Sequence, residues 1–195
     1  MKLEIFKYES VTSTNDVAID LINKNKVEYG FICANKQTKG RGTHGKEWIS
    51  KRGNFFGTVF FPLKKIYPPF NEFSIINPII ISDVIKNLYK KDNINLKFPN
   101  DIFFNQKKIC GILQEVITHH GKKFLITGIG LNIISNPNIK GKYLATNILL
   151  QTKKKPEIEK IMHLIIASYE KFFTNLNSYN YIKFKKKAEL MSLKY

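Results

Sequence analysis

The sequence contains only two cysteines, Cys33 and Cys110, and each lies within an apolar, strand-like run. Such positions are typical of inert, reduced thiols, so we expect no disulfide between them. Long apolar runs are also missing, because polar residues or proline interrupt each one before the roughly 18 residues that a membrane span requires. Residues 1–10 alternate charged and apolar side chains and lack the apolar block of a signal peptide. We therefore expect a soluble, unprocessed protein of the cytoplasm that does not bind membranes.

Arginine is scarce, although the chain is strongly basic. The net charge of +17 is compatible with nucleic-acid binding, because basic surfaces bind phosphate backbones through counterion release. However, Arg41 and Arg52 are the only arginines, and recognition of phosphates and base edges favours the bidentate guanidinium. Lysine, asparagine and isoleucine are frequent everywhere, a pattern typical of chain-wide compositional drift. The charge therefore does not predict specific DNA binding.

The length and the apolar content predict one compact domain. A chain of 195 residues with 43% hydrophobic residues can bury a full core without disulfides or metals. The sequence has no internal repeat, and the basic run at residues 153–155 is too short for a linker. We therefore expect residues 1–195 to form a single domain.

Strand-like and helix-like patterns succeed one another along the chain. The predicted strands cover residues 3–8, 31–34, 54–61, 95–98, 102–105, 109–117 and 124–132. Four helices are predicted. The first begins after a cap at Ser13 or Thr14, and the second covers residues 74–90, where Pro78 starts or kinks it. The third and fourth cover residues 156–173 and 181–190. Turn-prone residues at 105–107 and 119–122 predict hairpins. This order predicts an α/β or α+β domain with a mixed β-sheet flanked by helices.

Four polar clusters lie at the ends of predicted strands, where binding residues gather on loops held by a rigid scaffold. They comprise Ser13-Thr14-Asn15, then Gln37 to Lys46 followed by Trp48, then Lys97 to Asp101 with Lys108 to Leu113, and finally Gly128 to Asn132. We call residues 37–46 the glycine loop.

The glycine loop has the residues of an anion site. Gly40, Gly42 and Gly45 permit close backbone approach, and Arg41 and Lys46 add cations for a phosphate or a carboxylate. The loop does not match the Walker pattern, since no Gly-Lys-Ser/Thr follows at the required spacing, and it does not match a dinucleotide fingerprint that opens a helix, since a β run comes next. A basic surface loop without a ligand remains the alternative.

The third cluster combines two lysines with a glycine. Lys97 and Lys108 flank a short predicted hairpin, so strand alternation can direct both side chains toward one pocket. Gly111 would allow a ligand to approach the backbone closely. Solvated surface lysines and an ordinary turn at residues 99–101 remain the alternatives.

The order and the residues of all four clusters resemble those of the biotin protein ligase family. That family has a Ser-Thr-Asn signature, a Gly-Arg-Gly-Arg-x-Gly-Arg loop, a Lys-Trp-Pro-Asn-Asp motif, a Lys-x-x-Gly-Ile-Leu strand and a Gly-x-Gly-x-Asn strand, and each has a counterpart here. The resemblance covers residues 11–149 and includes Ala145-Thr146-Asn147, where the family often has Ala-Thr-Ser. It implies the class II synthetase-like fold of biotin/lipoate ligases. We expect neither an amino-terminal helix-turn-helix domain nor a carboxy-terminal β-barrel, because residues 1–195 leave no room for them.

The resemblance implies an ATP-dependent biotin protein ligase that uses MgATP and biotin. The biotin carboxylate attacks the α-phosphate to give biotinyl-5′-AMP, and a lysine of a biotin carboxyl carrier domain, of the acetyl-CoA carboxylase type, attacks this mixed anhydride. Bringing a carboxylate against a triphosphate costs Coulomb repulsion, which preorganised cations and N–H donors offset. No metal site made of the protein's own residues is expected.

The same resemblance assigns the catalytic candidates Lys108, Arg41 and Asp101. Lys108 contacts the carboxylate and the α-phosphate, Arg41 covers the adenylate, and Asp101 orients or deprotonates the acceptor amine. The binding candidates for biotin and its adenylate are Ser13, Thr14, Asn15, Gln37, Gly40, Arg41, Gly42, Thr43, Trp48, Lys97, Asn100, Lys108, Gly111 and Asn132. Core packing for Trp48 and an ordinary turn carboxylate for Asp101 remain the alternatives.

Three residues depart from the family pattern. Thr43 and Lys46 replace arginines of the loop, which weakens its expected grip on the adenylate, and Phe98 replaces a tryptophan and loses the indole N–H. A lipoate or octanoyl ligase of the same fold and a non-enzymatic biotin- or nucleic-acid-binding module are the alternative functions. The first lacks support because the Arg-Arg-x-Ser-Gly-Gly-Gly signature of lipoate enzymes is missing. The oligomeric state is left open, with a homodimer as one option.

Overall fold

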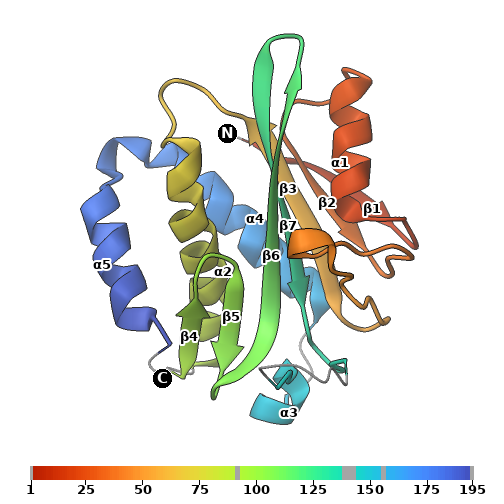
Figure 1. Ribbon diagram of the computed structural model, residues 1–195, viewed down its shortest axis with the longest axis vertical. Coiled ribbons are helices and arrows are strands. Elements are labelled where there is room, and N and C mark those ends of the chain that lie inside the picture. The colour runs from red at the N-terminus through yellow and green to blue at the C-terminus, as the bar shows by residue number, and fades with distance from the viewer. Residues whose placement is uncertain (1, 91–92, 138–143, 155–156, 194–195) are drawn as a thin grey trace.

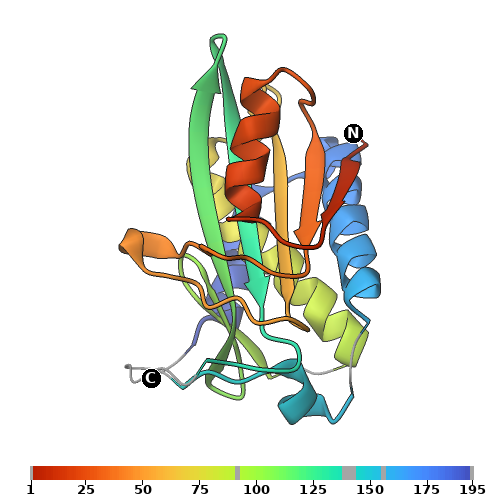
Figure 2. The ribbon, with the colours of Figure 1, turned by 90° about the vertical axis from the view of Figure 1, so that its right-hand side faces the viewer.

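The computed structural model describes residues 2–90, 93–137, 144–154 and 157–193. Within these ranges, a seven-stranded mixed sheet carries helices on both of its faces (Figures 1 and 2). The strand order is β1-β2-β3-β7-β6-β5-β4, in which β1 and β2 are parallel and the other neighbouring pairs are antiparallel. The predicted mixed sheet with flanking helices is therefore confirmed.

The strands are β1 (Glu4–Tyr8), β2 (Gly30–Ala34), β3 (Phe55–Pro62), β4 (Ile94–Lys97), β5 (Asp101–Phe104), β6 (Lys107–His119) and β7 (Lys122–Leu131). The helices are α1 (Thr14–Asn23), α2 (Phe73–Tyr89), α3 (Ile148–Thr152), α4 (Ile158–Thr174) and α5 (Tyr181–Met191), and the short 3-10 helices are η1 (Thr43–Gly45), η2 (Phe70–Glu72) and η3 (Leu176–Ser178). Each predicted strand and helix has its counterpart, whereas α3 was not predicted. Pro78 lies inside α2 and does not start it, and Pro156, the predicted start of α4, lies outside the described residues.

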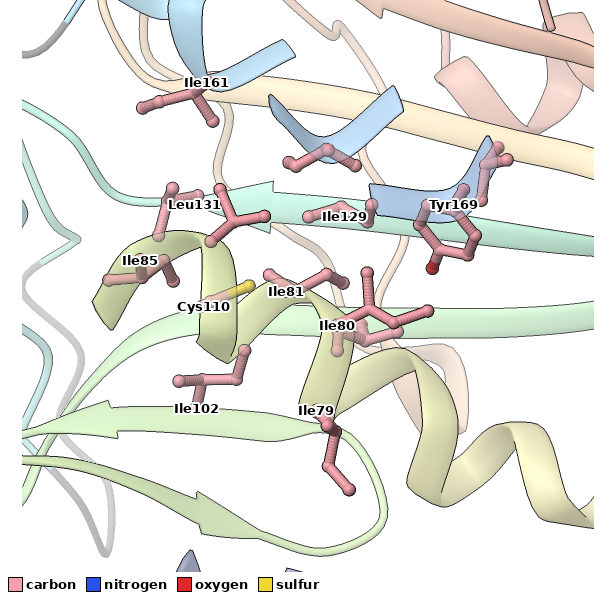
Figure 3. Packing of buried hydrophobic residues seen from close by; sticks show 14 of the residues in the cluster. Ile79, Ile80, Ile81, Ile85, Ile102, Cys110, Ile129, Leu131, Ile161 and Tyr169 are labelled. Atoms are coloured by element: carbon pink, nitrogen blue, oxygen red, sulfur yellow. The ribbon is translucent and has the colours of Figure 1, made fainter. Parts of the chain in front are cut away.

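One face of the sheet packs against α2 and α4 to form the main core. Ile129 and Leu131 of β7 and Cys110 of β6 lie on this face, and Ile81 of α2 and Tyr169 of α4 pack there with them (Figure 3). All five side chains are buried. Since burying a large aliphatic side chain contributes roughly 1.5–3 kcal/mol, this face supplies much of the driving force for folding.

A polar group inside this core is fully partnered. The Tyr169 hydroxyl donates to Asn77 Oδ1 at 2.9 Å, and Asn77 Nδ2 donates to Gln114 Oε1 at 3.0 Å and to Thr127 Oγ1 at 3.1 Å. These bonds join α2 and α4 to β6 and β7. Because buried polar groups are costly when unpaired, the network fixes how the two helices sit on the sheet.

The opposite face is covered by α1 over only part of its area. Ala18 and Ile22 of α1 form a second apolar cluster with Ile32, Phe60 and Ile126 of the sheet. Figure 2 shows the loop after β2 crossing the same face beside the amino-terminal end of α1. The rest of this face therefore lies under a polar loop rather than under a helix.

Both cysteines are free and buried, as predicted. Burial raises the pKa of the Cys33 thiol to about 11 and raises that of Cys110 further. Both thiols are therefore protonated and unreactive near neutral pH. In the described part of the chain, every helix is too short or too polar to cross a bilayer.

Candidate active site

A cavity of about 470 Å³ lies on the α1 face of the sheet. Its walls come from the start of α1, the glycine loop, the β4–β5 hairpin, β6 and β7. The predicted site residues that line it are Ser13, Thr14, Asn15, Gln37, Arg41, Gly42, Thr43, Trp48, Lys97, Asn100, Asp101, Lys108, Gly111 and Asn132. The fold thus brings four separate sequence clusters into one space, and of the predicted residues only Gly40 is missing from the lining.

Gly40 has a packing role in the glycine loop. A Cβ on Gly40 would lie 2.4 Å from the Trp48 carbonyl oxygen and 2.6 Å from Ser50 Oγ. The Gly40 carbonyl accepts a hydrogen bond from the Trp48 N–H at 2.9 Å. The glycine is therefore needed for close approach of two backbone segments, which sequence alone could not distinguish from close approach to a ligand.

Glycines on β6 and β7 form the floor of the cavity beneath Trp48. A Cβ on Gly130 would lie 2.3 Å from Trp48 Cε2, and one on Gly111 would lie 2.6 Å from Trp48 Cζ3. The indole therefore lies directly against the sheet. Its Nε1 is buried without a hydrogen-bond partner among the described residues. Trp48 thus packs against the protein and lines the cavity as well, and the two interpretations of this residue are compatible.

Lys108 reaches the cavity through an irregularity in β6. Regular alternation from Gly111 would place Lys108 on the opposite face of the sheet. However, Ile102 pairs with Cys110 and Phe103 pairs with Lys108, so Ile109 is an extra residue in β6. A bulge of this kind re-aims the neighbouring side chain, which accounts for Lys108 and Gly111 lining the same cavity.

Lys108 forms an ion pair with Asp101 inside the cavity. Lys108 Nζ lies 2.7 Å from Asp101 Oδ1 and 5.5 Å from the centre of the Trp48 ring. Asp101 is the first residue of β5, and its side chain is only 16% exposed. It is therefore not an ordinary turn carboxylate, because it holds the lysine ammonium at one end of the cavity.

The segment that follows β7 runs beside Lys108. The Lys108 N–H donates to the Leu144 carbonyl at 2.9 Å, and the Thr146 N–H donates to the Lys108 carbonyl at 2.9 Å. Asn132 Nδ2 donates to the Thr146 carbonyl at 3.1 Å. The predicted residues Ala145-Thr146-Asn147 thus hold the backbone of Lys108 from the side opposite β5, and Asn147 caps α3.

Neutral donors and acceptors gather where α1 begins. The Thr14 N–H and hydroxyl both donate to Gln37 Oε1, at 2.9 and 3.1 Å, and Gln37 Nε2 donates to Ser50 Oγ at 3.0 Å. Ser13 is the N-cap of α1, but its side chain makes no capping hydrogen bond. The predicted side-chain cap by Ser13 or Thr14 is therefore wrong, because the Thr14 hydroxyl turns to the glycine loop instead.

Arg41 is held by two carboxylates that the sequence did not identify. Its Nη1 and Nη2 lie 2.6 and 2.8 Å from the two carboxylate oxygens of Glu115, and Nη2 also lies 2.8 Å from Asp16 Oδ1. The hydrogen bonds that Arg41 donates to Glu115 are the main cause of the raised pKa of Arg41. Glu115 follows Gly111 and Leu113 at every second position of β6, so alternation was the available signal for its place on this face.

Cations outnumber carboxylates in the cavity. Its charged lining residues are Arg41, Lys46, Lys97, Lys108, Glu47 and Asp101. The hairpin between β4 and β5 also contacts the glycine loop, since Asn100 Nδ2 donates to Thr43 Oγ1 at 3.4 Å. Together with the amide and hydroxyl groups near α1, this lining suits an elongated ligand with a neutral polar end, an apolar middle and an anionic end. Among the described residues, no group of three or more His, Cys, Asp or Glu side chains could hold a metal ion.

Comparison with known proteins gives a consistent result. The model of the Biotin/lipoate A/B protein ligase family matches residues 8–132. The bifunctional ligase/repressor BirA of Bacillus subtilis is 26% identical over 191 residues, which cover 95% of this chain and 58% of that protein. A biotin--[acetyl-CoA-carboxylase] ligase of Paracoccus denitrificans is 24% identical and is covered over 65% of its length. The chain therefore spans less than two thirds of these curated relatives.

Solved structures of biotin protein ligases have the same fold. The enzyme from Leishmania major in complex with biotinyl-5-AMP superimposes with a TM-score of 0.84 at 26% identity, over 98% of this chain and 83% of that one. The enzyme from Aquifex aeolicus in complex with biotin and ATP gives a TM-score of 0.81 at 26% identity, over 97% of this chain and 78% of that one. The predicted resemblance to the catalytic domain of biotin protein ligases is confirmed, and the chain belongs to the Biotin/lipoate A/B protein ligase family.

Proposed function

We propose that this chain is an ATP-dependent biotin protein ligase that forms biotinyl-5′-AMP and transfers biotin to a lysine of a carrier domain. The observation that supports this most directly is the composition of the cavity on the α1 face. It combines Lys108 and Lys97 at one end with the neutral groups of Thr14 and Gln37, and it has a glycine floor under Trp48. The relatives named biotin ligases and the structures with biotin, ATP or biotinyl-5-AMP support the same assignment.

Biotin matches the cavity from end to end. Its ureido ring is neutral, with one carbonyl and two N–H groups, and requires fixed donors and acceptors, which Ser13, Thr14 and Gln37 supply. Its aliphatic chain would lie against Trp48, whose indole covers the glycines of the floor. Its carboxylate would then reach the ammonium group of Lys108.

Lys108 and the glycine loop would offset the charge that develops during activation. A carboxylate oxygen attacks the α-phosphorus of ATP, the bond to the β-phosphate bridge breaks, and pyrophosphate leaves with the bond electrons. Lys108 neutralises the reacting anions, and the loop with Arg41 covers the product. Magnesium enters as part of the substrate MgATP, because Mg²⁺ favours phosphate oxygens with one or two carboxylates, and Asp101 and Glu47 are the carboxylates in the cavity.

Transfer requires a neutral acceptor amine. Asp101 lies 2.7 Å from Lys108 Nζ, so it stands next to the expected position of the mixed anhydride. It can accept a hydrogen bond from the incoming lysine, orient it and take its proton. The acceptor is proposed to be the biotin carboxyl carrier domain of a biotin-dependent carboxylase, of the acetyl-CoA carboxylase type, with the cytoplasm as the compartment.

The test is incubation of the protein with ATP, Mg²⁺, biotin and such a carrier domain, followed by intact mass measurement. We expect a gain of one biotin on the carrier. Lipoic acid in place of biotin is the matched comparison, since the family also contains lipoate ligases. Modification by lipoic acid and not by biotin would assign the rival activity, and no modification by either would contradict ligation.

A further inference from the structure

Glu115 connects the glycine loop to β6. It lies near the middle of this strand, where it pairs with Ile126 of β7. From there its carboxylate accepts two hydrogen bonds from Arg41, at 2.6 and 2.8 Å, and Asp16 of α1 holds Nη2 from a second direction. We call Arg41, Glu115 and Asp16 the loop clamp. Within it, Arg41 and Glu115 form a bidentate pair, which constrains their geometry more than a single contact does.

The loop clamp continues into a buried hydrogen-bond network that returns to the same loop. Glu115 Oε2 accepts from Asn15 Nδ2 at 2.7 Å. The Thr58 hydroxyl lies 2.7 Å from Asn15 Oδ1 and 2.8 Å from Thr14 Oγ1, and Thr14 donates to Gln37. Thr14, Asn15 and Thr58 are at most 3% exposed. The hydrogen-bond network therefore leaves the glycine loop at Arg41 and returns to it at Gln37. The four peptide bonds between these two residues complete a closed ring.

In this geometry the Arg41 guanidinium is not a mobile cation that is free to bind a ligand. Its two outer nitrogens are already bound to carboxylates, and Nε is buried without a partner among the described residues. A guanidinium held in this way fixes the backbone of the loop over the cavity, and the other end of the network fixes the amide of Gln37. Small displacements of such groups change ligand binding strongly, because the contacts depend on position.

We propose that Glu115 is a positioning residue, which acts through Arg41 and Asn15 to hold the glycine loop and Gln37 in the conformation that retains biotin and its adenylate. The identity of the ligand rests on the proposed function, whereas the positioning of the loop does not. Neither Glu115 nor Asp16 belongs to the motifs by which the sequence resembles the family.

The first test needs no ligand. Hydrogen exchange in the wild type and in Glu115→Ala measures the loop amides of Lys39, Gly42 and Lys46, which have hydrogen-bond acceptors in the structure. We expect at least about tenfold faster exchange at these amides in Glu115→Ala, with the amides of α4 unchanged. The matched control is Glu28→Gln, which breaks an exposed ion pair with Lys122 far from the loop. Equal protection of the loop in all three proteins would overturn the proposal.

The second test separates positioning from direct contact. Calorimetry gives the biotin Kd of the wild type, Glu115→Ala, Arg41→Ala and the double variant, and we expect about a tenfold increase in each single variant. The double variant should be no weaker than the weaker single variant, because both act through one pair. Glu115→Gln, which keeps an acceptor for Asn15, should fall between Glu115→Ala and the wild type.

Each outcome of this second test has one meaning. Multiplied effects in the double variant, or an unchanged Kd in Glu115→Ala, would overturn the positioning role. If the wild type fails to bind biotin while Glu115→Ala still loosens the loop, the proposed function falls and the loop clamp stands. Steady-state kinetics add a check, since a positioning defect should raise the KM for biotin more than it lowers the rate of transfer from preformed adenylate.

Discussion

The two faces of the sheet differ although the same strands build both. On β6 and β7, Ile112, Ile129 and Leu131 point into the main core, whereas Gly111 and Gly130, their neighbours in sequence, lie under Trp48. At these positions the core face carries branched side chains, and the cavity face carries glycine. Alternation along a strand therefore allows adjacent residues to serve stability and ligand binding separately.

The difference between the two faces leads to a general expectation about substitutions. Changes on the core face should lower the free energy of unfolding and leave ligand affinity nearly unchanged. Changes on the cavity face should alter binding or catalysis and leave the unfolding midpoint nearly unchanged. Four substitutions test this separation.

Lys108→Ala should lower the rate of adenylate formation at least about a hundredfold, because it removes a charge contact that acts on the reacting anions. Pyrophosphate release with biotin and MgATP measures the rate. The matched control is Lys107→Ala, since Lys107 is the exposed neighbour in the same strand. Near wild-type kinetics in Lys108→Ala would remove this lysine from the mechanism.

Gly130→Ala should weaken biotin binding about tenfold or more, because the new Cβ would lie 2.3 Å from the indole of Trp48 and displace it. Calorimetry measures the Kd, and quenching of the fluorescence of Trp48, the only tryptophan, reports the movement of the ring. Unchanged affinity together with a shifted fluorescence spectrum would show that the indole does not line the ligand subsite.

Ile129→Val tests the other face at the adjacent position. The loss of one buried methyl group should lower the free energy of unfolding by about 0.5–1.5 kcal/mol. Urea denaturation followed by circular dichroism measures this value, and the biotin Kd should stay within about twofold of the wild type. A larger change in Kd than in Gly130→Ala would contradict the separation of the faces.

Thr43→Arg restores a family arginine at the rim of the cavity and should slow escape of biotinyl-AMP by roughly threefold to tenfold, through a partly exposed charged contact. A trapping assay measures the off-rate. His44→Arg adds the same charge at an exposed neighbouring position that does not line the cavity, and it should leave the rate unchanged. Equal effects of both variants would indicate a general electrostatic influence.

Much of the fold was predictable because local patterns determined it. The β-branched and aromatic residues of β3, β6 and β7, the turn-prone residues between β6 and β7 and the polar cluster that starts α1 are all local signals in the sequence. The resemblance of the motifs to those of the family identified which loops meet in space. The predicted residues other than Gly40 line the cavity. Their individual roles, the single-domain extent, the oligomeric state and the compartment remain predictions.

The remaining features depended on contacts between distant segments. The face to which Lys108 points follows from a bulge at Ile109, which is a property of the β5–β6 register rather than of β6 alone. Glu115 gains its partners from the glycine loop and α1, and the Thr14 hydroxyl binds Gln37 instead of capping its own helix. Gly40 packs against the Trp48 carbonyl oxygen and the Ser50 side chain, whereas its sequence context suggested a ligand contact.

The most direct test of the central claim is a crystal structure of this protein with a non-hydrolysable biotinyl-AMP analogue. We predict that the linkage between the biotin and phosphate groups lies within hydrogen-bond distance of Lys108 Nζ, with the ureido ring near Thr14 and Gln37. An analogue bound with this linkage away from Lys108, or outside the cavity, would contradict the claim that one cavity holds both reacting anions.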